Sequence, residues 1–241
     1  MPYRKEQFIN GEIYHVVIRR LEDYLLFKDI DDYYRGIFSI YEFNTTNPVE
    51  ILERRKARAE LKKSQASGDP LSLADSRDKL VDILLFCLMP NHIHLLLRQL
   101  KEGGITTYMN KLGAGYPAYF KQKYGIKTRG YFFQGRFVSV RIKTDDQLKI
   151  VFVYIHTNPI SLIEPGWKEL GIKKPKKAVG FVENYKWSSY PDYLGKKNFP
   201  SVTEREFILK VMGGPQGCKD FVESWIMHKG GIKEFPELAL E

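Results

Sequence analysis

The chain has 241 residues, of which 43% are hydrophobic, and a formal net charge of +9 at pH 7. This hydrophobic content is enough for a folded core and excludes a largely disordered chain. The sequence has no apolar run of about 18 residues and no signal-peptide pattern, so we expect no membrane association. Cys87 and Cys218 stand in apolar surroundings without metal-binding spacing. We expect them to be reduced core residues of a cytoplasmic protein.

The positive charge is concentrated in residues 111–149, which hold nine Lys or Arg residues and only two acidic ones, Asp145 and Asp146. The same window contains Tyr116, Tyr119, Phe120, Tyr124, Tyr131, Phe132, Phe133 and Phe137. Cations interleaved with aromatic rings are typical of a surface that binds single-stranded nucleic acid. A solvated basic face above ordinary core aromatics explains the composition equally well.

The first half of the chain predicts strands and helices in alternation. Residues 12–20 alternate and are rich in β-branched side chains, which indicates a strand. Residues 31–43 have helical spacing. Residues 45–79 are charged and read as a surface insertion that contains a solvated helix over 49–63. Residues 81–100 predict two strands joined by a turn at Met89, Pro90 and Asn91.

The second half predicts mainly helices. A helix is expected over 105–124, with Gly113, Gly115 and Pro117 as candidate breaks, followed by a strand over 137–143. Thr144 is a helix N-cap, and the helix that it starts ends before Pro159. Residues 173–177 read as a basic loop, and two short helices follow near 203–212 and 216–228. We therefore predict an α+β fold in which helices back one face of an antiparallel sheet.

His92 and His94 stand two residues apart in the apolar run 85–97. Side chains alternate along a strand, so both imidazoles point to one face while Ile93, Leu95 and Leu97 enter the core. We expect the histidines to be displayed on an open face of the sheet. Such a pair can hold a divalent ion, although two hydrogen-bonded histidines on a solvated face have the same pattern.

The predicted helix before Pro159 has an apolar stripe of Leu148, Val151, Phe152 and Ile155. Tyr154 falls on the flank of this stripe, and Asn158 lies on the same side one turn later. Both side chains can therefore reach the histidine face, unless Pro159 pushes Asn158 out of helical geometry. The alternative is a tyrosine that anchors the helix and an asparagine that caps it.

Four ordered motifs carry a family resemblance: "MPNHIHLLL" (89–97), "YFFQGRF" (131–137), "YIHTNPI" (154–160) and "WSSYPDYL" (187–194). Together they resemble the one-tyrosine transposases of the HUH superfamily, above all the REP-associated tyrosine transposases, and "YHVVIRR" (14–20) is similar to their first strand. The resemblance implies a ferredoxin- or RRM-like HUH domain over 1–195, interrupted by the insertion at about 45–79. A helical extension over 196–241 follows it.

The resemblance also implies cleavage and rejoining of single-stranded DNA, folded into hairpins, through a 5′-phosphotyrosine. Tyr154 would be the nucleophile, and His92, His94 and Asn158 would bind Mg²⁺ or Mn²⁺. His156 is a rival ligand but should face away from Tyr154. The rival nucleophiles Tyr108, Tyr119 and Tyr124 read as core or stacking residues. Candidate DNA contacts are Gln134, Arg136, Arg141 and Lys143.

Two other functions stay open. A non-catalytic nucleic-acid-binding protein derived from a transposase would use the same basic surface but would give the histidine pair no role. A metal-dependent nuclease that uses water would release free 5′-phosphate ends instead of protein-linked DNA. We expect a nucleoid-associated protein of bacterial type, as a monomer or a homodimer.

Overall fold

The computed structural model describes residues 7–66, 77–127 and 130–228. Its centre is a four-stranded sheet in the order β2-β3-β1-β4, in which all neighbours are antiparallel. The strands are β1 (Ile13–Arg19), β2 (Val81–Met89), β3 (His92–Gln99) and β4 (Val138–Ile142). The predicted α+β class, the four strands and the turn between β2 and β3 are thus confirmed.

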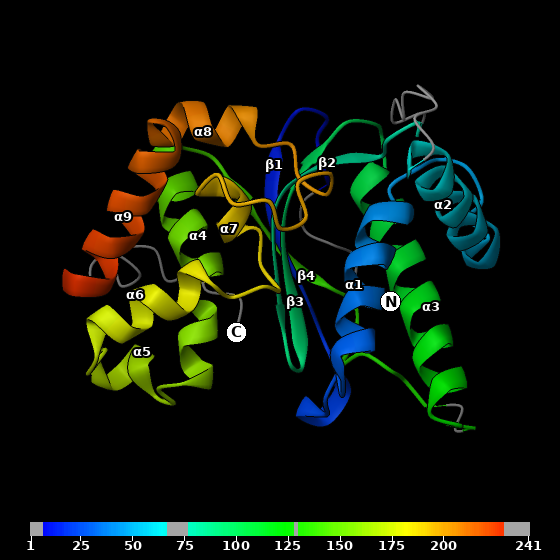
Figure 1. Cartoon of the computed structure of the whole chain (residues 1–241), viewed down its shortest axis with the longest axis horizontal. Helices are drawn as coiled ribbons and strands as arrows, with labels where there is room; N and C mark the ends of the chain where they lie inside the picture. Colours follow the sequence, from blue (N-terminus) through cyan, green and yellow to red (C-terminus); the bar gives the residue numbers. More distant parts are fainter. Residues whose placement is uncertain (1–6, 67–76, 128–129, 229–241) are drawn as a thin grey trace.

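Helices α1 (Ile30–Glu42) and α3 (Gly104–Lys123) cover the first face of the sheet (Figure 1). The core there contains Ile93, Leu95 and Leu97 of β3, as the alternation predicts. The predicted break in α3 does not occur, because the helix runs through Pro117. A Cβ atom at Gly115 would lie 2.1 Å from the Phe43 ring, so this glycine serves close packing and not a turn.

The second face of the sheet is also covered, which contradicts the expected open face. Helix α4 (Asp145–Thr157) packs its predicted apolar stripe on Leu85, Cys87 and Leu96, and Cys218 lies in the same core. An apolar stripe on α4 needs a partner surface, and the strands supply it. Six further helices extend this layer: η2 (Asn158–Leu162), α5 (Trp167–Leu170), α6 (Pro175–Glu183), α7 (Tyr190–Tyr193), α8 (Glu206–Met212) and α9 (Gly214–His228). The predicted basic loop at 173–177 is instead the start of α6, with Pro175 in the first turn, a position that favours proline.

Two elements lie outside these layers. The short η1 (Leu21–Asp23) follows β1, and α2 (Ile51–Ala66) falls within the predicted insertion and projects beside α1 and α3 (Figure 1). Within the described ranges, no helix combines the length and the apolar character that a membrane crossing requires.

Candidate active site

The side chains of His92 and His94 point to the same face of β3, as predicted, with their ring centroids 4.7 Å apart. They are not displayed, however, because His92 is 6% exposed and His94 is fully buried. The reason is the second helical layer, since α4 and η2 lie over the part of the sheet that was expected to face solvent.

Hydrogen bonds to neighbouring side chains set the orientation of both histidine rings. Nδ1 of His92 donates to the side-chain oxygen of Asn91 (2.6 Å), so that in the neutral tautomer Nε2 carries the lone pair. Nε2 of His94 accepts from the amide nitrogen of Asn158 (3.0 Å), so its Nδ1–H donates to Nε2 of His15 (3.0 Å). Burial, reinforced by the neighbouring His92 and His15, keeps the pKa of His94 well below its ordinary value. His94 is therefore neutral at pH 7 and has the protonation state of a metal ligand.

Helix α4 brings Tyr154 and Asn158 to these histidines. The Thr144 hydroxyl caps its first turn by accepting from the Gln147 amide (3.2 Å), as predicted. Asn158 keeps helical angles (φ −49°, ψ −41°) because the short η2 continues directly from α4 with Pro159 in its first turn. The anticipated displacement by Pro159 is thus wrong, and Asn158 lies one turn after Tyr154 on the same side.

Tyr154 lies between the sheet and a lysine from α5. Its ring centroid is 5.7 Å from those of both His15 and His94. Nζ of Lys168 stands 5.0 Å from the centre of the Tyr154 ring and donates to the side-chain oxygen of Asn158 (3.3 Å). Tyr154 is only 2% exposed and its hydroxyl oxygen is buried. The phenol therefore reaches the histidine site, as expected, but in this conformation it is covered.

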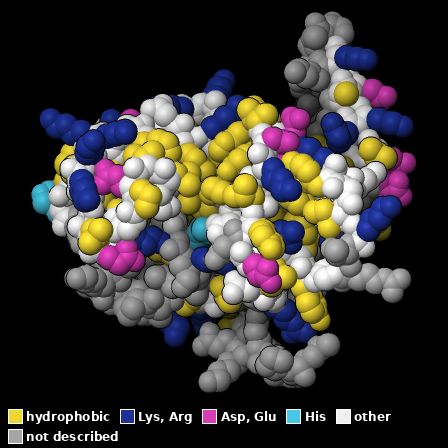
Figure 2. Space-filling view, turned by 90° about the horizontal axis from the view of Figure 1, so that it is seen from below, with side chains coloured by type: hydrophobic (Ala, Val, Ile, Leu, Met, Phe, Trp, Pro, Cys, Tyr) yellow, Lys and Arg dark blue, Asp and Glu magenta, His cyan; other side chains and the backbone are white. Residues whose placement is uncertain are grey.

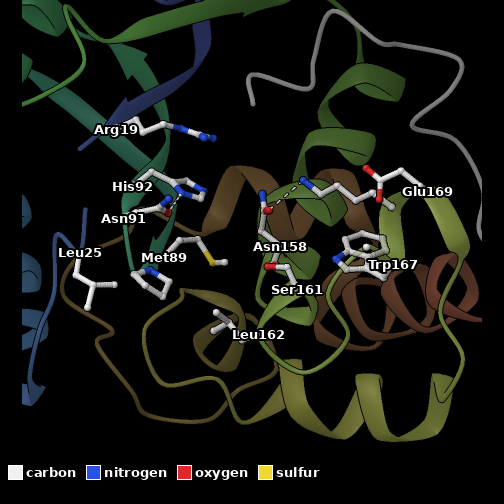
Figure 3. A pocket seen from close by; sticks show the side chains of 13 residues that line it. Arg19, Leu25, Met89, Asn91, His92, Asn158, Ser161, Leu162, Trp167 and Glu169 are labelled. Atoms are coloured by element: carbon white, nitrogen blue, oxygen red, sulfur yellow. Dashed lines mark hydrogen bonds between the residues drawn. The ribbon is translucent and has the colours of Figure 1, made fainter. Parts of the chain in front are cut away.

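A cavity of about 440 Å³ opens beside this group (Figure 3). Its wall contains His92 and Asn158 together with the cationic side chains of Arg19 and Lys168. Figure 3 shows Arg19, His92 and Asn158 around this cavity, on β1, β3 and η2. Two cations around a histidine–amide pair form a suitable place for an anionic group such as a phosphate.

The rival residues lie elsewhere. His156 is buried on the far side of α4, where its Nε2 is 2.9 Å from the Ser189 hydroxyl, and burial lowers its pKa to about 3. Tyr108 donates to the Ile40 carbonyl beneath α1 (3.0 Å), whereas Tyr119 and Tyr124 donate to Asp32 (2.9 and 2.7 Å). All three tyrosines belong to α3 or its end, on the opposite face of the sheet from His94, which agrees with the prediction that they have structural roles.

The four candidate DNA contacts do not form one group. The backbone of Gln134 donates to the carbonyl of Arg19 (3.0 Å), at the His92 end of the sheet, and Arg136 is exposed in the same loop. Arg141 pairs with Tyr14 towards the other end of β1 and forms an ion pair with Glu12 (2.8 Å). Lys143 is exposed just beyond it. The structure thus places Gln134 beside the candidate site, whereas Arg136 lines a cavity with α3 residues on the opposite face of the sheet. Arg141 and Lys143 lie towards the other end of β1.

The aromatic residues of the basic window are mostly core residues. Tyr116, Phe120, Phe132 and Phe133 are buried, whereas Tyr131 is 87% exposed. Of the two interpretations left open for this window, core packing therefore holds for the four buried rings. Composition alone does not distinguish a ring that packs between helices from a ring that faces solvent.

Sequence reasoning missed His15, Lys168, Arg19 and Asn91. His15 lies in the predicted first strand, but its contact with His94 depends on the pairing of β1 with β3. Lys168 stands ten residues after Asn158, in a helix that had not been predicted. Asn91 had been interpreted only as a turn residue. Strand parity could have placed His15 on one face, but no pattern indicates the pairing register.

Residues 69–158 match the family model described as "Transposase IS200 like". The resemblance to the tyrosine transposases is confirmed. The matched segment contains all four residues of the candidate site, His92, His94, Tyr154 and Asn158. A solved structure, described as a REP-associated tyrosine transposase bound to a REP hairpin, is also similar to this chain. The similarity covers 86% of this chain and 96% of that one, with 16% identity and a TM-score of 0.47. Among curated proteins, none matches this sequence.

Proposed function

We propose that this protein cleaves and rejoins single-stranded DNA that is folded into hairpins, with Tyr154 as the nucleophile and a divalent metal ion as cofactor. One observation carries the proposal: β3 and the end of α4, far apart in the sequence, bring His92, His94, Asn158 and Tyr154 together. The IS200-like transposase match over 69–158 supports the same class of reaction.

The donor set fits Mg²⁺ or Mn²⁺. His92 and His94 would bind through Nε2. The Asn158 amide, whose nitrogen now donates to His94 and whose oxygen accepts from Lys168, would turn to bind through that oxygen. Within the described residues, no three His, Cys, Asp or Glu side chains are grouped for a metal, so the amide is the available third ligand. When bound, the ion would offset negative charge on the scissile phosphate.

Tyr154 would perform the covalent step. Its hydroxyl oxygen attacks the phosphorus, the bond from phosphorus to the 3′ oxygen breaks, and the departing oxygen leaves as a 3′-OH with the proton that the phenol gives up. The DNA strand is then joined to the enzyme by a 5′-phosphotyrosine. Attack by another 3′-OH reverses the step and transfers the strand without an external energy source. Because the hydroxyl is buried here, neighbouring side chains would have to move before DNA reaches it, and Lys168, whose Nζ lies 5.0 Å from the ring centre, is one of them.

The remaining polar groups would hold the DNA. Arg19 and Lys168 line the cavity beside His92, and Gln134 lies next to Arg19. Arg136 would contact DNA that passes over the α3 face of the sheet. Arg141 and Lys143 would contact a more distant part of the backbone along β4, and Arg141 would exchange its bond with Glu12 for a phosphate.

The experiment compares Tyr154→Phe with Tyr131→Phe, a matched change at an exposed tyrosine. Each protein is incubated with end-labelled hairpin DNA and Mn²⁺, and a denaturation-resistant complex is measured on a denaturing gel. We expect the wild type and Tyr131→Phe to form the complex, and Tyr154→Phe to bind the hairpin but form none. A complex with Tyr154→Phe would show that Tyr154 is the wrong residue. Free 5′-phosphate ends without a complex would favour the water-using nuclease, and binding alone would favour the non-catalytic protein.

A further inference from the structure

A second cavity, of about 600 Å³, lies on the other side of the molecule between α1, α2 and α3. It shares no lining residue with the cavity beside His92. An ion pair between Arg54 and Glu42 (3.9 Å) links α2 to the end of α1 at this place. The lining residues are Asp31, Tyr34, Arg35, Phe38, Arg55, Tyr119 and Lys123. The cavity is therefore both basic and aromatic.

Arg35 is the central group of this cavity. Its guanidinium lies over the Tyr119 ring, 4.9 Å from the ring centre. Its Nε is buried and has no hydrogen-bond acceptor within the part of the chain that the structure describes. Burial lowers the pKa of Arg35, and the charge of Arg55 acts in the same direction. Two arginines that repel each other beside an unsatisfied N–H are stabilised by an anion between them.

The other charged groups of the cavity determine how much positive charge remains to attract an anionic ligand. Lys123 is held by Asp29 (2.7 Å) and Asp32 (2.8 Å), so its ammonium is largely neutralised within the fold. Asp31 opposes an incoming anion from the same wall. The usable charge is thus that of Arg35 and Arg55, reduced by one carboxylate. This is suitable for a single phosphate group.

An aromatic ring stands beside these arginines. Tyr34 on α1 is 42% exposed. Its ring packs edge to face against Trp187, with the ring centroids 5.1 Å apart, and this contact restrains the ring. The Lys186 ammonium donates to the Tyr34 hydroxyl and brings a further cation to this rim. Seen from below, Lys and Arg side chains lie among hydrophobic surface and acidic side chains on the half of the molecule that carries α1 and α2 (Figure 2). An exposed ring between cations is the arrangement that binds single strands, because the base stacks while the backbone is neutralised.

We propose that the cavity between α1, α2 and α3 binds a phosphate of single-stranded DNA next to the hairpin, with a base stacked on Tyr34. Only the choice of DNA as the ligand rests on the function proposed above, because the geometry itself requires a phosphate and a planar ring. The basic and aromatic surface that composition suggested for residues 111–149 is thus provided mainly by α1 and α2.

The test measures binding of two fluorescein-labelled hairpins, one blunt and one with a single-stranded extension of about 8 thymidines. The proteins are the wild type, Arg35→Gln/Arg55→Gln, Asp31→Asn, and Lys56→Gln as the control. Lys56 is exposed on α2 but does not line the cavity. Affinity is measured at several salt concentrations, and thermal melting with inorganic phosphate serves as a separate arm.

For the extended hairpin, we expect the double variant to bind more weakly and to lower the salt slope by about 0.7, which corresponds to one lost phosphate contact. Asp31→Asn should bind this hairpin more tightly, and Lys56→Gln should behave like the wild type. Binding of the blunt hairpin should change in none of them. Equal losses for both hairpins, or a double variant that matches Lys56→Gln, would overturn the proposal. So would a site that responds to free phosphate but not to the extension. Adduct formation is a separate measurement, so a failed catalytic proposal would leave this result intact.

Discussion

His15 provides the sharpest test of the candidate metal centre, because it touches the site only through His94. Its Nε2 accepts from Nδ1 of His94 at 3.0 Å, and both side chains are fully buried. This bond fixes the tautomer that puts the lone pair on Nε2 of His94, where a metal ion would replace the Asn158 amide N–H as its partner. In His15→Phe a ring still fills the space, but the acceptor is lost.

The expected effect is a large loss of metal affinity. Loss of an outer partner of a ligating histidine lowers affinity about 10- to 100-fold, which corresponds to about 1.4–2.8 kcal/mol. The same range follows from the fold, since a buried N–H left without its acceptor costs about 1–3 kcal/mol. The His94 proton can avoid that cost by moving to Nε2, and the ligand is then lost.

Titration calorimetry with Mn²⁺ on chelator-treated protein measures this affinity directly. His156→Phe is the matched control, because it also replaces a fully buried histidine but one that bonds to Ser189 on the other side of α4. We expect His15→Phe to lose Mn²⁺ affinity while His156→Phe keeps it, and both to retain hairpin binding. If His15→Phe bound Mn²⁺ within about twofold of the wild type, His94 would not be a ligand oriented by His15.

Two further predictions concern charges. Lys168→Met removes the ammonium that lies beside the Asn158 amide and would repel a bound metal ion. In the same titration, Mn²⁺ should therefore bind about fivefold more tightly, a gain of about 1 kcal/mol. Unchanged or weaker binding would contradict this repulsion. Asp32→Asn should lower the free energy of unfolding by about 2–3 kcal/mol at pH 7, because the buried carboxylate accepts from Lys123, Tyr119 and Tyr124. Burial alone would raise the pKa of Asp32, but these bonds hold it below its ordinary value. In urea unfolding, the difference in the free energy of unfolding between Asp32→Asn and the wild type should be complete above pH ~4 and should shrink as the pH falls further. Asp31→Asn, at an exposed carboxylate, is the control. A difference that persists at low pH would refute the charge explanation.

The sequence was sufficient where a local period decides the structure. The two-residue period of β3 placed His92 and His94 together and Ile93 opposite them, and the helical period of α4 placed Asn158 one turn after Tyr154. The helical geometry of α4 continues to Asn158 although Pro159 follows, because proline is accepted in the first turn of η2.

What the sequence did not predict depends on contacts between distant segments. The burial of His94 comes from α4 packing on the sheet, and its bond to His15 comes from the register of β1 against β3. Neither is encoded in a window around the residue itself. The buried rings of Tyr116 and Phe132 illustrate the same limit, because the residue type alone does not show whether an aromatic ring lies in the core or stacks on a base.

The covered hydroxyl of Tyr154 is the feature in which the structure departs most from a ready nucleophile. Trp167 is buried and its ring lies 5.6 Å from that of Trp225, which anchors α5 to α9. Lys168 on α5 is therefore expected to move as a side chain and not with its helix. Breaking its bond to Asn158 costs about 1 kcal/mol, and partly exposing a buried ring costs about 1.5–3 kcal/mol. An open state of such energy is a minor population that a bound phosphate can stabilise by attracting the Lys168 ammonium. The lysine that covers the tyrosine would then become a phosphate contact, so that the phenol is exposed only when DNA is in place.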